Sequence, residues 1–216
     1  MELGGYFLVL TGTLLLHGFV TYGVLLKGLT GLNPVIFLRK MEDAIMFAFS
    51  TASSNATIPV TLETVKNRLG VKNRVASFTV PLGATVNMDG TAIMQGVATA
   101  FIAQAFNIDL TMGDYLAVIL TATLASVGTA GVPGVGLIML AMVLNQVGLP
   151  LEGIALIMGV DRLLDMIRTA VNITGDSAAS VIVANSEGAL DKERFNDPLA
   201  GEKEEEVHFV PAEENK

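Results

Sequence analysis

Five apolar stretches follow one another along the chain, and polar or glycine-rich breaks interrupt the middle three. Residues 3–29 form a nearly uninterrupted apolar run, long enough to cross about 30 Å of bilayer core at about 1.5 Å per residue. Residues 152–184 form a second long run that is typical of a single helix. We therefore predict an all-helical membrane protein in which both runs are full transmembrane spans.

Residues 35–65 and 115–148 each consist of two short apolar arms around a helix-breaking centre. The first centre, Ser50–Val60, is rich in serine, and the second, Ser126–Gly136, contains four glycines and Pro133. Glycine is entropically poor in a helix and proline lacks the N–H donor, so neither centre is expected to stay helical. Because broken backbone is tolerated in a membrane only where protein or a cavity covers it, we predict two re-entrant helical hairpins. One kinked span over the second region is the alternative.

The stretch between the hairpins, residues 75–106, is predicted to be a broken span. Its middle holds GATVNMDGT (residues 83–91), where an unwound turn would free carbonyl groups to ligate a cation. The same order, a hairpin and then a span with an Asn and an Asp beside Gly and Thr, recurs at NITGD (residues 172–176). We interpret the two halves as an inverted repeat whose hairpins enter from opposite faces.

Basic residues surround the first hairpin and are absent from the second. Lys27, Arg39 and Lys40 precede its centre, and the segment Glu63–Arg74 carries four more bases. By the positive-inside rule these flanks are cytoplasmic, so the second hairpin enters from outside. The last residues, 186–216, contain ten acids and four bases. We expect them to form an acidic, disordered cytoplasmic tail.

The composition supports a membrane protein and excludes some kinds of site. Hydrophobic residues make up 51% of the 216 residues and charged residues 16%, with a mean hydropathy of +0.58. A soluble domain of this size is rarely so apolar. The chain has no Cys, which excludes disulfides and Cys-ligated metals, and its two His residues make no His-based zinc site.

One face of the last span carries a stripe of polar side chains. A helix advances about 100° per residue, so residues three, four and seven positions apart share a face. The stripe consists of Asp161, Asp165, Arg168, Thr169, Asn172 and Asp176. A charge at mid-bilayer costs at least about 2.5 kcal/mol, so such residues pair, face the protein interior or bind a ligand. A purely structural Asp–Arg pair is the alternative, but the surplus of oxygen groups around one fixed cation favours a site for a charged solute and a cation.

Four segments together carry a family resemblance. They are SSNATIPVT, PLGATVNMDGTA, ASVGTAGVPGVG and DRLLDMIRTAVNITGD, in this order. From Leu3 to Leu190 the chain resembles the second half of the dicarboxylate/amino acid:cation symporters, the glutamate transporter family. The resemblance implies a glutamate-transporter-like transport domain that moves like an elevator, and a homotrimer when the protein is full length. It also implies a truncated chain that lacks the first five spans, either a fragment or an internal start.

The resemblance further implies which residues bind the solute. Arg168 would hold the side-chain carboxylate, which suits its bidentate fork, and Asp165 would take the ammonium group. The implied substrate-binding residues are Ser53, Ser54, Thr91, Val132, Gly136, Asp165, Arg168, Thr169 and Asn172. Ala52 stands where some relatives place a second Arg, which bears on substrate affinity and on the cation requirement.

The resemblance implies three cation sites. The first uses the side chains of Asp176 and Asn172 with the carbonyls of Gly83 and Asn87. The second uses carbonyls only, those of Thr85, Ser126, Val127 and Thr129. The third involves Asn87 and Asp89. Oxygen ligands of this kind suit a hard cation such as sodium.

The function expected from these observations is secondary symport of glutamate or aspartate, coupled to sodium or protons. Symport of C4-dicarboxylates is the alternative within the class, although Asp165 would repel a second carboxylate. An intramembrane aspartyl enzyme is disfavoured, because Arg168 would hold Asp165 ionised. Inactivity of the truncated chain alone is the third possibility. We expect no enzymatic activity, no cofactor beyond Na⁺ or H⁺ and no nucleic-acid partner, in a multi-pass protein of a bacterial or archaeal inner membrane.

Flexibility is expected to differ between the two hairpins. The centre Ser126–Gly136 has four glycines, whereas the tip around Ser53–Thr57 has none. Glycine supplies the backbone freedom that hinges use, so the second hairpin is predicted to be the extracellular lid.

Overall fold

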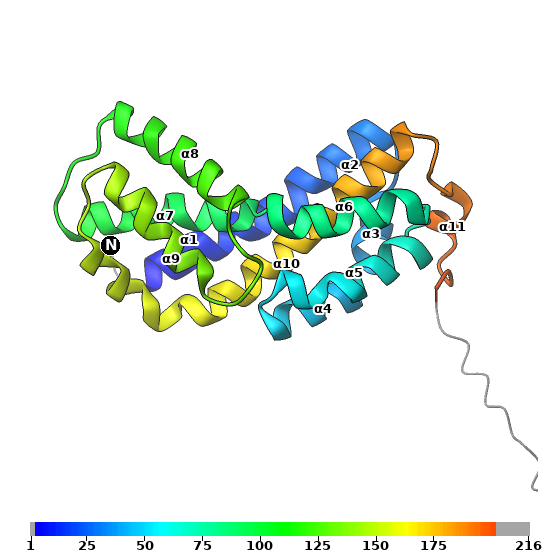
Figure 1. The fold of residues 1–216 in the computed structure, drawn as a ribbon, viewed down its shortest axis with the longest axis horizontal. Coiled ribbons are helices and arrows are strands. Elements are labelled where there is room, and N and C mark those ends of the chain that lie inside the picture. The colour runs from blue at the N-terminus through cyan, green and yellow to red at the C-terminus, as the bar shows by residue number, and fades with distance from the viewer. Residues whose placement is uncertain (1–2, 202–216) are drawn as a thin grey trace, which may run out of the picture.

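The computed structural model describes residues 3–201, and every regular element in that range is a helix apart from one isolated bridge between Val71 and Leu190. The all-helical prediction is confirmed for these residues. The molecule is elongated, and α10 (Ile154–Ser186) runs along its length with the other helices packed around it (Figure 1).

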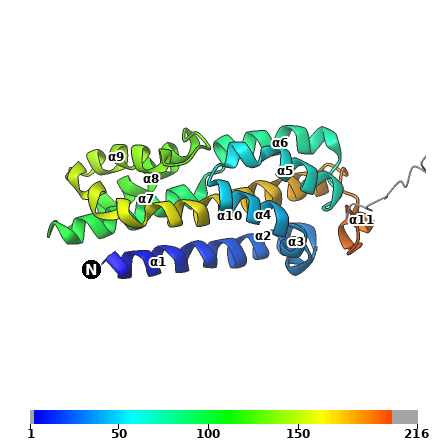
Figure 2. The same cartoon turned by 90° about the horizontal axis from the view of Figure 1, so that it is seen from below.

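The first long helix lies along one side of the bundle (Figure 2). It consists of α1 (Leu3–Leu16), a π-helical turn η1 (His17–Thr21) and α2 (Tyr22–Thr30). Among residues 3–201 it is the helix that is both long and apolar enough to cross a membrane. It ends at Gly31, whose positive φ of 75° favours glycine.

Two helical hairpins pack beside α10. The first follows α3 (Pro34–Lys40) and consists of α4 (Glu42–Thr51) and α5 (Ser54–Asn67). The second consists of α8 (Met112–Val127) and α9 (Val135–Gln146), and the short η2 (Leu151–Gly153) leads from it to α10. These elements and α6, α7 and α11, described below, complete the helices of the described residues.

The prediction that the centre Ser50–Val60 leaves the helix is wrong for all but Ala52 and Ser53, because a cap restarts the helix at Ser54 and Pro59 lies inside α5. Ala52 adopts a left-handed conformation with φ of 51°, and Ser53 then caps α5 by accepting a hydrogen bond from the Ala56 N–H at 3.1 Å. In the second hairpin the glycines and Pro133 leave residues 128–134 outside any helix.

The tips of the two hairpins touch near the middle of the molecule (Figure 1). The carbonyl oxygen of Gly131 accepts two hydrogen bonds, from the Asn55 N–H at 3.0 Å and from Ser53 Oγ at 2.7 Å. A Cβ at Gly131 would lie 2.7 Å from Asn55 Oδ1, so glycine is required for this close approach. Neither hairpin could satisfy its broken backbone in this way alone.

A break also divides the segment between the hairpins. Helix α6 (Asn73–Val86) ends before Asn87 and Met88, and α7 (Asp89–Ala105) begins directly after them. Both helices pack against α10, so the break faces the polar stripe of α10.

The expectation of a disordered tail is wrong for residues 187–201. This segment folds back as α11 (Lys192–Asn196), with the Lys72 N–H bonded to Ala189 O at 2.9 Å and the Asp191 N–H to Gly70 O at 2.8 Å. Phe195 is fully buried, and its burial stabilises the folded segment. The prediction relied on acidic composition alone and took no account of this side chain. Residues 202–216 lie outside the described range.

Candidate binding site

The polar stripe of α10 is buried in the interior of the protein. Exposed fractions are 8% or less for all six of its members, Asp161, Asp165, Arg168, Thr169, Asn172 and Asp176. Arg168 is only 1% exposed, which is exceptional for a guanidinium and requires charged partners.

Arg168 lies between two carboxylates of its own helix. Its Nη1 donates to Asp161 Oδ1 at 3.2 Å and its Nη2 donates to Asp165 Oδ1 at 2.6 Å. Its Nε is buried without a hydrogen-bond partner among the described residues. One cation and two acids therefore share a buried space, and the two carboxylates do not use all five N–H donors of the guanidinium.

The tip of the second hairpin closes directly over this cluster. The backbone N–H of Gly134 donates to Asp165 Oδ2 at 2.9 Å, so Asp165 holds both Arg168 and the hairpin tip. A Cβ at Gly136 would lie 3.1 Å from Arg168 Nη2, which places this backbone against the guanidinium.

A small cavity lies where both hairpin tips, the break before α7 and the α10 stripe meet. Its volume is about 20 Å³, room for about one water molecule. It is lined by Ala52, Ser54, Met88, Thr91, Thr129, Ala130, Gly131, Val132, Gly136, Asp165, Thr169 and Asn172. Seven of the nine residues predicted to bind substrate are in this lining; Arg168 lies beside it against Gly136, and Ser53 lies behind it against Gly131.

Sequence reasoning missed three lining residues, namely Met88, Ala130 and Gly131, assigned Thr129 to a cation site alone, and noted Ala52 without counting it among the substrate-binding residues. Met88 stands in the NMDGT segment between two predicted ligands, and its Sδ lies 3.7 Å from Asn172 Nδ2. Its position in the break was a usable signal. Ala52 was noted for its bearing on substrate affinity, but its left-handed backbone conformation was not predicted.

A second polar cluster surrounds Asp176, which is 1% exposed. Asn87 Nδ2 donates to Asp176 Oδ1 at 3.0 Å, and Gly83 lies so close that a Cβ there would be 2.6 Å from the same oxygen. Asn172 Oδ1 accepts the Gly90 N–H at 2.9 Å on the other side of the break. The four residues predicted for the first cation site thus lie at the break between α6 and α7 or against it, and the Gly83 carbonyl there accepts the Asn87 N–H at 2.8 Å.

Asp89 lies in a separate cluster. His17 Nε2 is 2.7 Å from Asp89 Oδ2, and the Tyr22 hydroxyl donates to the same oxygen. His17 is thus paired with a predicted cation ligand. Its π-helical turn brings it and Tyr22 to the start of α7.

The carbonyl-only site is less assembled. Ser126 lies in the last turn of α8 and Thr129 lies just beyond its end, where the Thr129 N–H donates to Ser126 O at 3.2 Å. Thr85 lies on α6, which packs against α8, and its hydroxyl donates to Leu82 O at 2.9 Å. Among residues 3–201 no cluster of three His, Cys, Asp or Glu side chains forms a metal centre, so the oxygen groups described above are those that suit a hard cation.

Comparison with known proteins gives a family match over residues 1–186, to the model of the sodium:dicarboxylate symporter family. The chain belongs to the sodium:dicarboxylate symporter family. This confirms the resemblance inferred from the four segments, and it makes the chain part of a family of membrane-embedded, multi-pass transporters.

Several curated transporters are similar to this family member. The chain is 41% identical over 184 residues to the human excitatory amino acid transporter 5, a match that covers 85% of the chain and 33% of that protein. It is 43% identical over 178 residues to an excitatory amino acid transporter of Caenorhabditis elegans, a match that covers 82% of the chain and 35% of that protein. It is 42% identical over 182 residues to excitatory amino acid transporter 1 of Ambystoma tigrinum, a match that covers 84% of the chain and 34% of that protein. The chain spans about one third of the length of these relatives.

Replacing Gly83 tests the packing around Asp176. The Cβ that Gly83→Ala adds would lie 2.6 Å from Asp176 Oδ1, so the carboxylate must move away from Asn87. We therefore expect the free energy of unfolding to fall by about 1–3 kcal/mol. Gly96→Ala is the matched control, because its Cβ meets nothing within 4 Å and alanine favours the helix by up to about 1 kcal/mol. Thermal unfolding followed by circular dichroism measures both.

The loss in free energy of unfolding caused by Gly83→Ala should disappear in an Asp176→Ala background, where the carboxylate is absent. Equal effects of Gly83→Ala and Gly96→Ala would contradict this account of the cluster.

Proposed function

We propose that this chain forms the substrate- and cation-binding part of a sodium-coupled symporter for acidic amino acids. The observation that carries the proposal is Arg168, a guanidinium buried to 1% exposure between Asp161 and Asp165 at the meeting point of both hairpin tips. Three features support it: family membership, the names of the similar proteins, and the oxygen-rich clusters beside the cavity.

Charge balance favours an amino acid with an acidic side chain. The substrate carboxylate would replace an Asp carboxylate at the Arg168 fork, and the ammonium group would neutralise the Asp165 that is released. A C4-dicarboxylate brings a second negative charge toward Asp165 instead, which is unfavourable. Two acids around one base therefore fit glutamate or aspartate better.

Substrate entry requires the cavity to enlarge, because about 20 Å³ holds no amino acid. The contact that must break is the hydrogen bond from Gly134 to Asp165, and the segment that moves is the non-helical tip Ala130–Gly134. In this proposal the tip opens in the ligand-free protein when the hydrogen bond from Gly134 to Asp165 breaks, and it closes again over bound substrate and sodium.

Cation binding is proposed at the break between α6 and α7. Asp176 and Asn172 would contribute side-chain oxygens, and Gly83 and Asn87 would contribute carbonyls, as in broken helices of other transporters. Asp89 with Asn87 is proposed for a further cation, and the carbonyls near Thr85, Ser126, Val127 and Thr129 for another. No cofactor other than transported ions enters the proposal.

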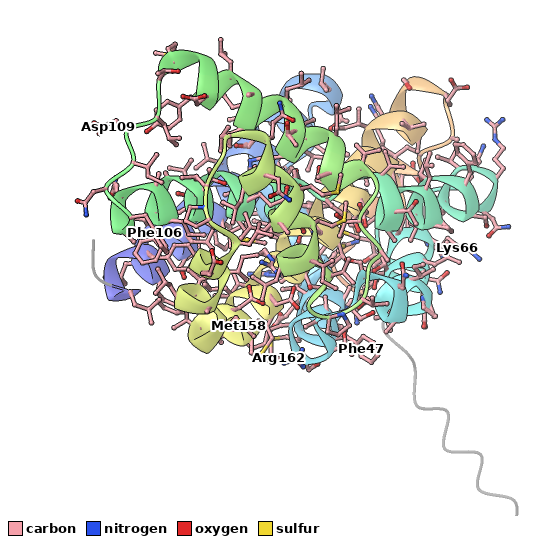
Figure 3. All side chains as sticks on the ribbon, turned by 60° about the vertical axis from the view of Figure 1, so that its left-hand side comes forward. Phe47, Lys66, Phe106, Asp109, Met158 and Arg162 are labelled. Carbon is pink, nitrogen blue, oxygen red and sulfur yellow. The ribbon has the colours of Figure 1, made fainter. Side chains whose placement is uncertain are left out.

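The arrangement in the membrane is also part of the proposal. The bases lie at one end of the molecule and the acidic loop at the other, as Lys66 and Asp109 show in Figure 3. With the basic end cytoplasmic, α4–α5 enter as a re-entrant hairpin from inside and α8–α9 from outside, as an inverted repeat. We propose elevator-type movement, a homotrimer for the full-length protein and contact with the lipid bilayer. The bacterial or archaeal inner membrane stays a prediction.

Truncating Arg168 tests the substrate assignment. Arg168→Ala should weaken glutamate or aspartate binding to the purified chain at least about thirtyfold, because it leaves Asp161 and Asp165 without their cation. Arg162→Ala is the matched control, since this exposed Arg lies on the same helix, six positions before Arg168 in the sequence (Figure 3). Calorimetric titration in the presence of sodium gives the dissociation constants.

Unchanged acidic amino acid binding in Arg168→Ala, or no such binding by the unmodified chain, would contradict the proposed function. Tighter binding of succinate than of aspartate would instead identify a dicarboxylate symporter.

Neutralising Asp176 tests the cation site. Asp176→Asn removes a buried anionic ligand, so the sodium concentration that gives half-maximal substrate binding should rise by about tenfold or more. Asp114→Asn, at the exposed cap of α8, should leave that concentration unchanged. If Asp176→Asn changes the pH dependence of substrate binding and not its sodium dependence, proton coupling is favoured. If it changes neither, Asp176 has a structural role.

A single introduced cysteine tests the lid. The chain has no native Cys, and Val132 in the tip is 45% exposed. Val132→Cys in sealed vesicles should react with an impermeant external thiol reagent quickly without ligand and slowly with substrate and sodium. Asp109→Cys in the outer loop is the control and should react equally in both conditions. Labelling of Val132→Cys from the cytoplasmic side alone would show that the topology is reversed.

A further inference from the structure

A cavity of about 410 Å³ lies at the basic end of the molecule, remote from the α10 stripe. It is lined by Val35, Ile36, Arg39, Lys40, Glu42, Arg68, Asn196, Pro198 and Ala200. None of these residues lines the small cavity of the binding site. In Figure 1 the elements that form it, α3, α4, the end of α5 and α11, gather at the right-hand end.

Lys40 fixes the walls of this basic cavity. It is 5% exposed, and its Nζ donates to Arg68 O and to Arg194 O, each at 2.8 Å. The same Nζ lies 5.9 Å from the centre of the Phe195 ring. One ammonium group therefore joins α3, the end of α5 and α11, so the cavity is a built feature of the fold and not a gap between loose segments.

Bases outnumber acids among the residues that line the cavity, and Asp197 next to the lining also lies near Lys40. Arg39, Lys40 and Arg68 face one acid in the lining, Glu42. Arg68 is already paired, with Asp43 Oδ2 2.7 Å from its Nη2. Arg39 has no hydrogen-bond or ion-pair partner among residues 3–201, so its planar fork is open to an anion.

The surroundings of the cavity are apolar as well as basic. Val35 is part of its wall and is 67% exposed, Ile36 lies beside it, and Leu199 near its rim is also 67% exposed. The protein belongs to a membrane-embedded family, so this end lies near a headgroup layer. A ligand that matches both features has a phosphate group for the bases and a hydrocarbon part for the apolar residues.

We propose that the basic cavity binds the phosphate headgroup of an anionic membrane lipid, with Arg39 as the principal contact and Lys40 as the residue that holds the walls. The lipid would bridge α3, the first hairpin and α11, and would stabilise the folded-back segment 187–201 against α3. This proposal rests on family membership and geometry, and does not depend on the substrate assigned to Arg168.

Native mass spectrometry with short-chain phosphatidylglycerol and phosphatidylcholine tests the proposal. The unmodified chain should bind phosphatidylglycerol preferentially, and Arg39→Gln should weaken that binding by about tenfold while phosphatidylcholine binding stays unchanged. Arg39→Lys should keep part of the affinity. Lys72→Gln, an exposed base at the same end but outside the lining, should bind like the unmodified chain.

Inorganic phosphate distinguishes a lipid from a soluble anion. If phosphate displaces phosphatidylglycerol only at a large excess, the lipid is the ligand, and if phosphate binds as tightly by itself, the proposal of a lipid is overturned. Equal losses in Arg39→Gln and Lys72→Gln would also overturn it, because general surface charge would then explain the binding. Affinity that emerges only in a chain ending at Gly201 would show that the acidic residues 202–216 occupy the cavity instead.

Discussion

A guanidinium that is almost fully buried in a membrane protein dictates much of the surrounding structure. Arg168 is stable there only because Asp161 and Asp165 supply charge and hydrogen bonds from the same helix. That arrangement leaves an excess acid, and Asp165 uses its second oxygen to hold the Gly134 N–H. The position of the second hairpin tip is therefore tied to the electrostatics of α10. Any solute that competes for Asp165 or Arg168 also acts on the hairpin.

Broken helices recur wherever polar groups must meet in the interior. The hairpin tips and the break at Asn87 and Met88 place backbone N–H and C=O groups at one level along α10. Each break needs partners from another segment, as Gly131 O shows by accepting from both Asn55 and Ser53. The binding site and the stability of these breaks are thus the same set of contacts, and glycines at closest approach permit them.

The two ends of the molecule have different chemistry. The basic end is closed by segment 187–201, which Lys40 and Phe195 anchor to α3 and to the loop after α5. At the opposite end the loop between α7 and α8 carries Asp109 and no base. Charge asymmetry of this kind orients a membrane protein, and at the basic end it also forms a cavity with an open guanidinium. Orientation and ligand binding can use the same residues.

The sequence by itself determined the helical fold and the polar stripe of α10. Periodicity of 3.6 residues and the high cost of charge in an apolar environment are local rules, and Asp161 to Asp176 follow them. Contacts between distant segments followed no such rule. The left-handed Ala52, the inward position of Met88 and the pairing of His17 with Asp89 depend on packing between elements. The acidic composition of residues 187–201 predicted disorder, but the segment is ordered, because burial of the apolar Phe195 side chain stabilises its fold.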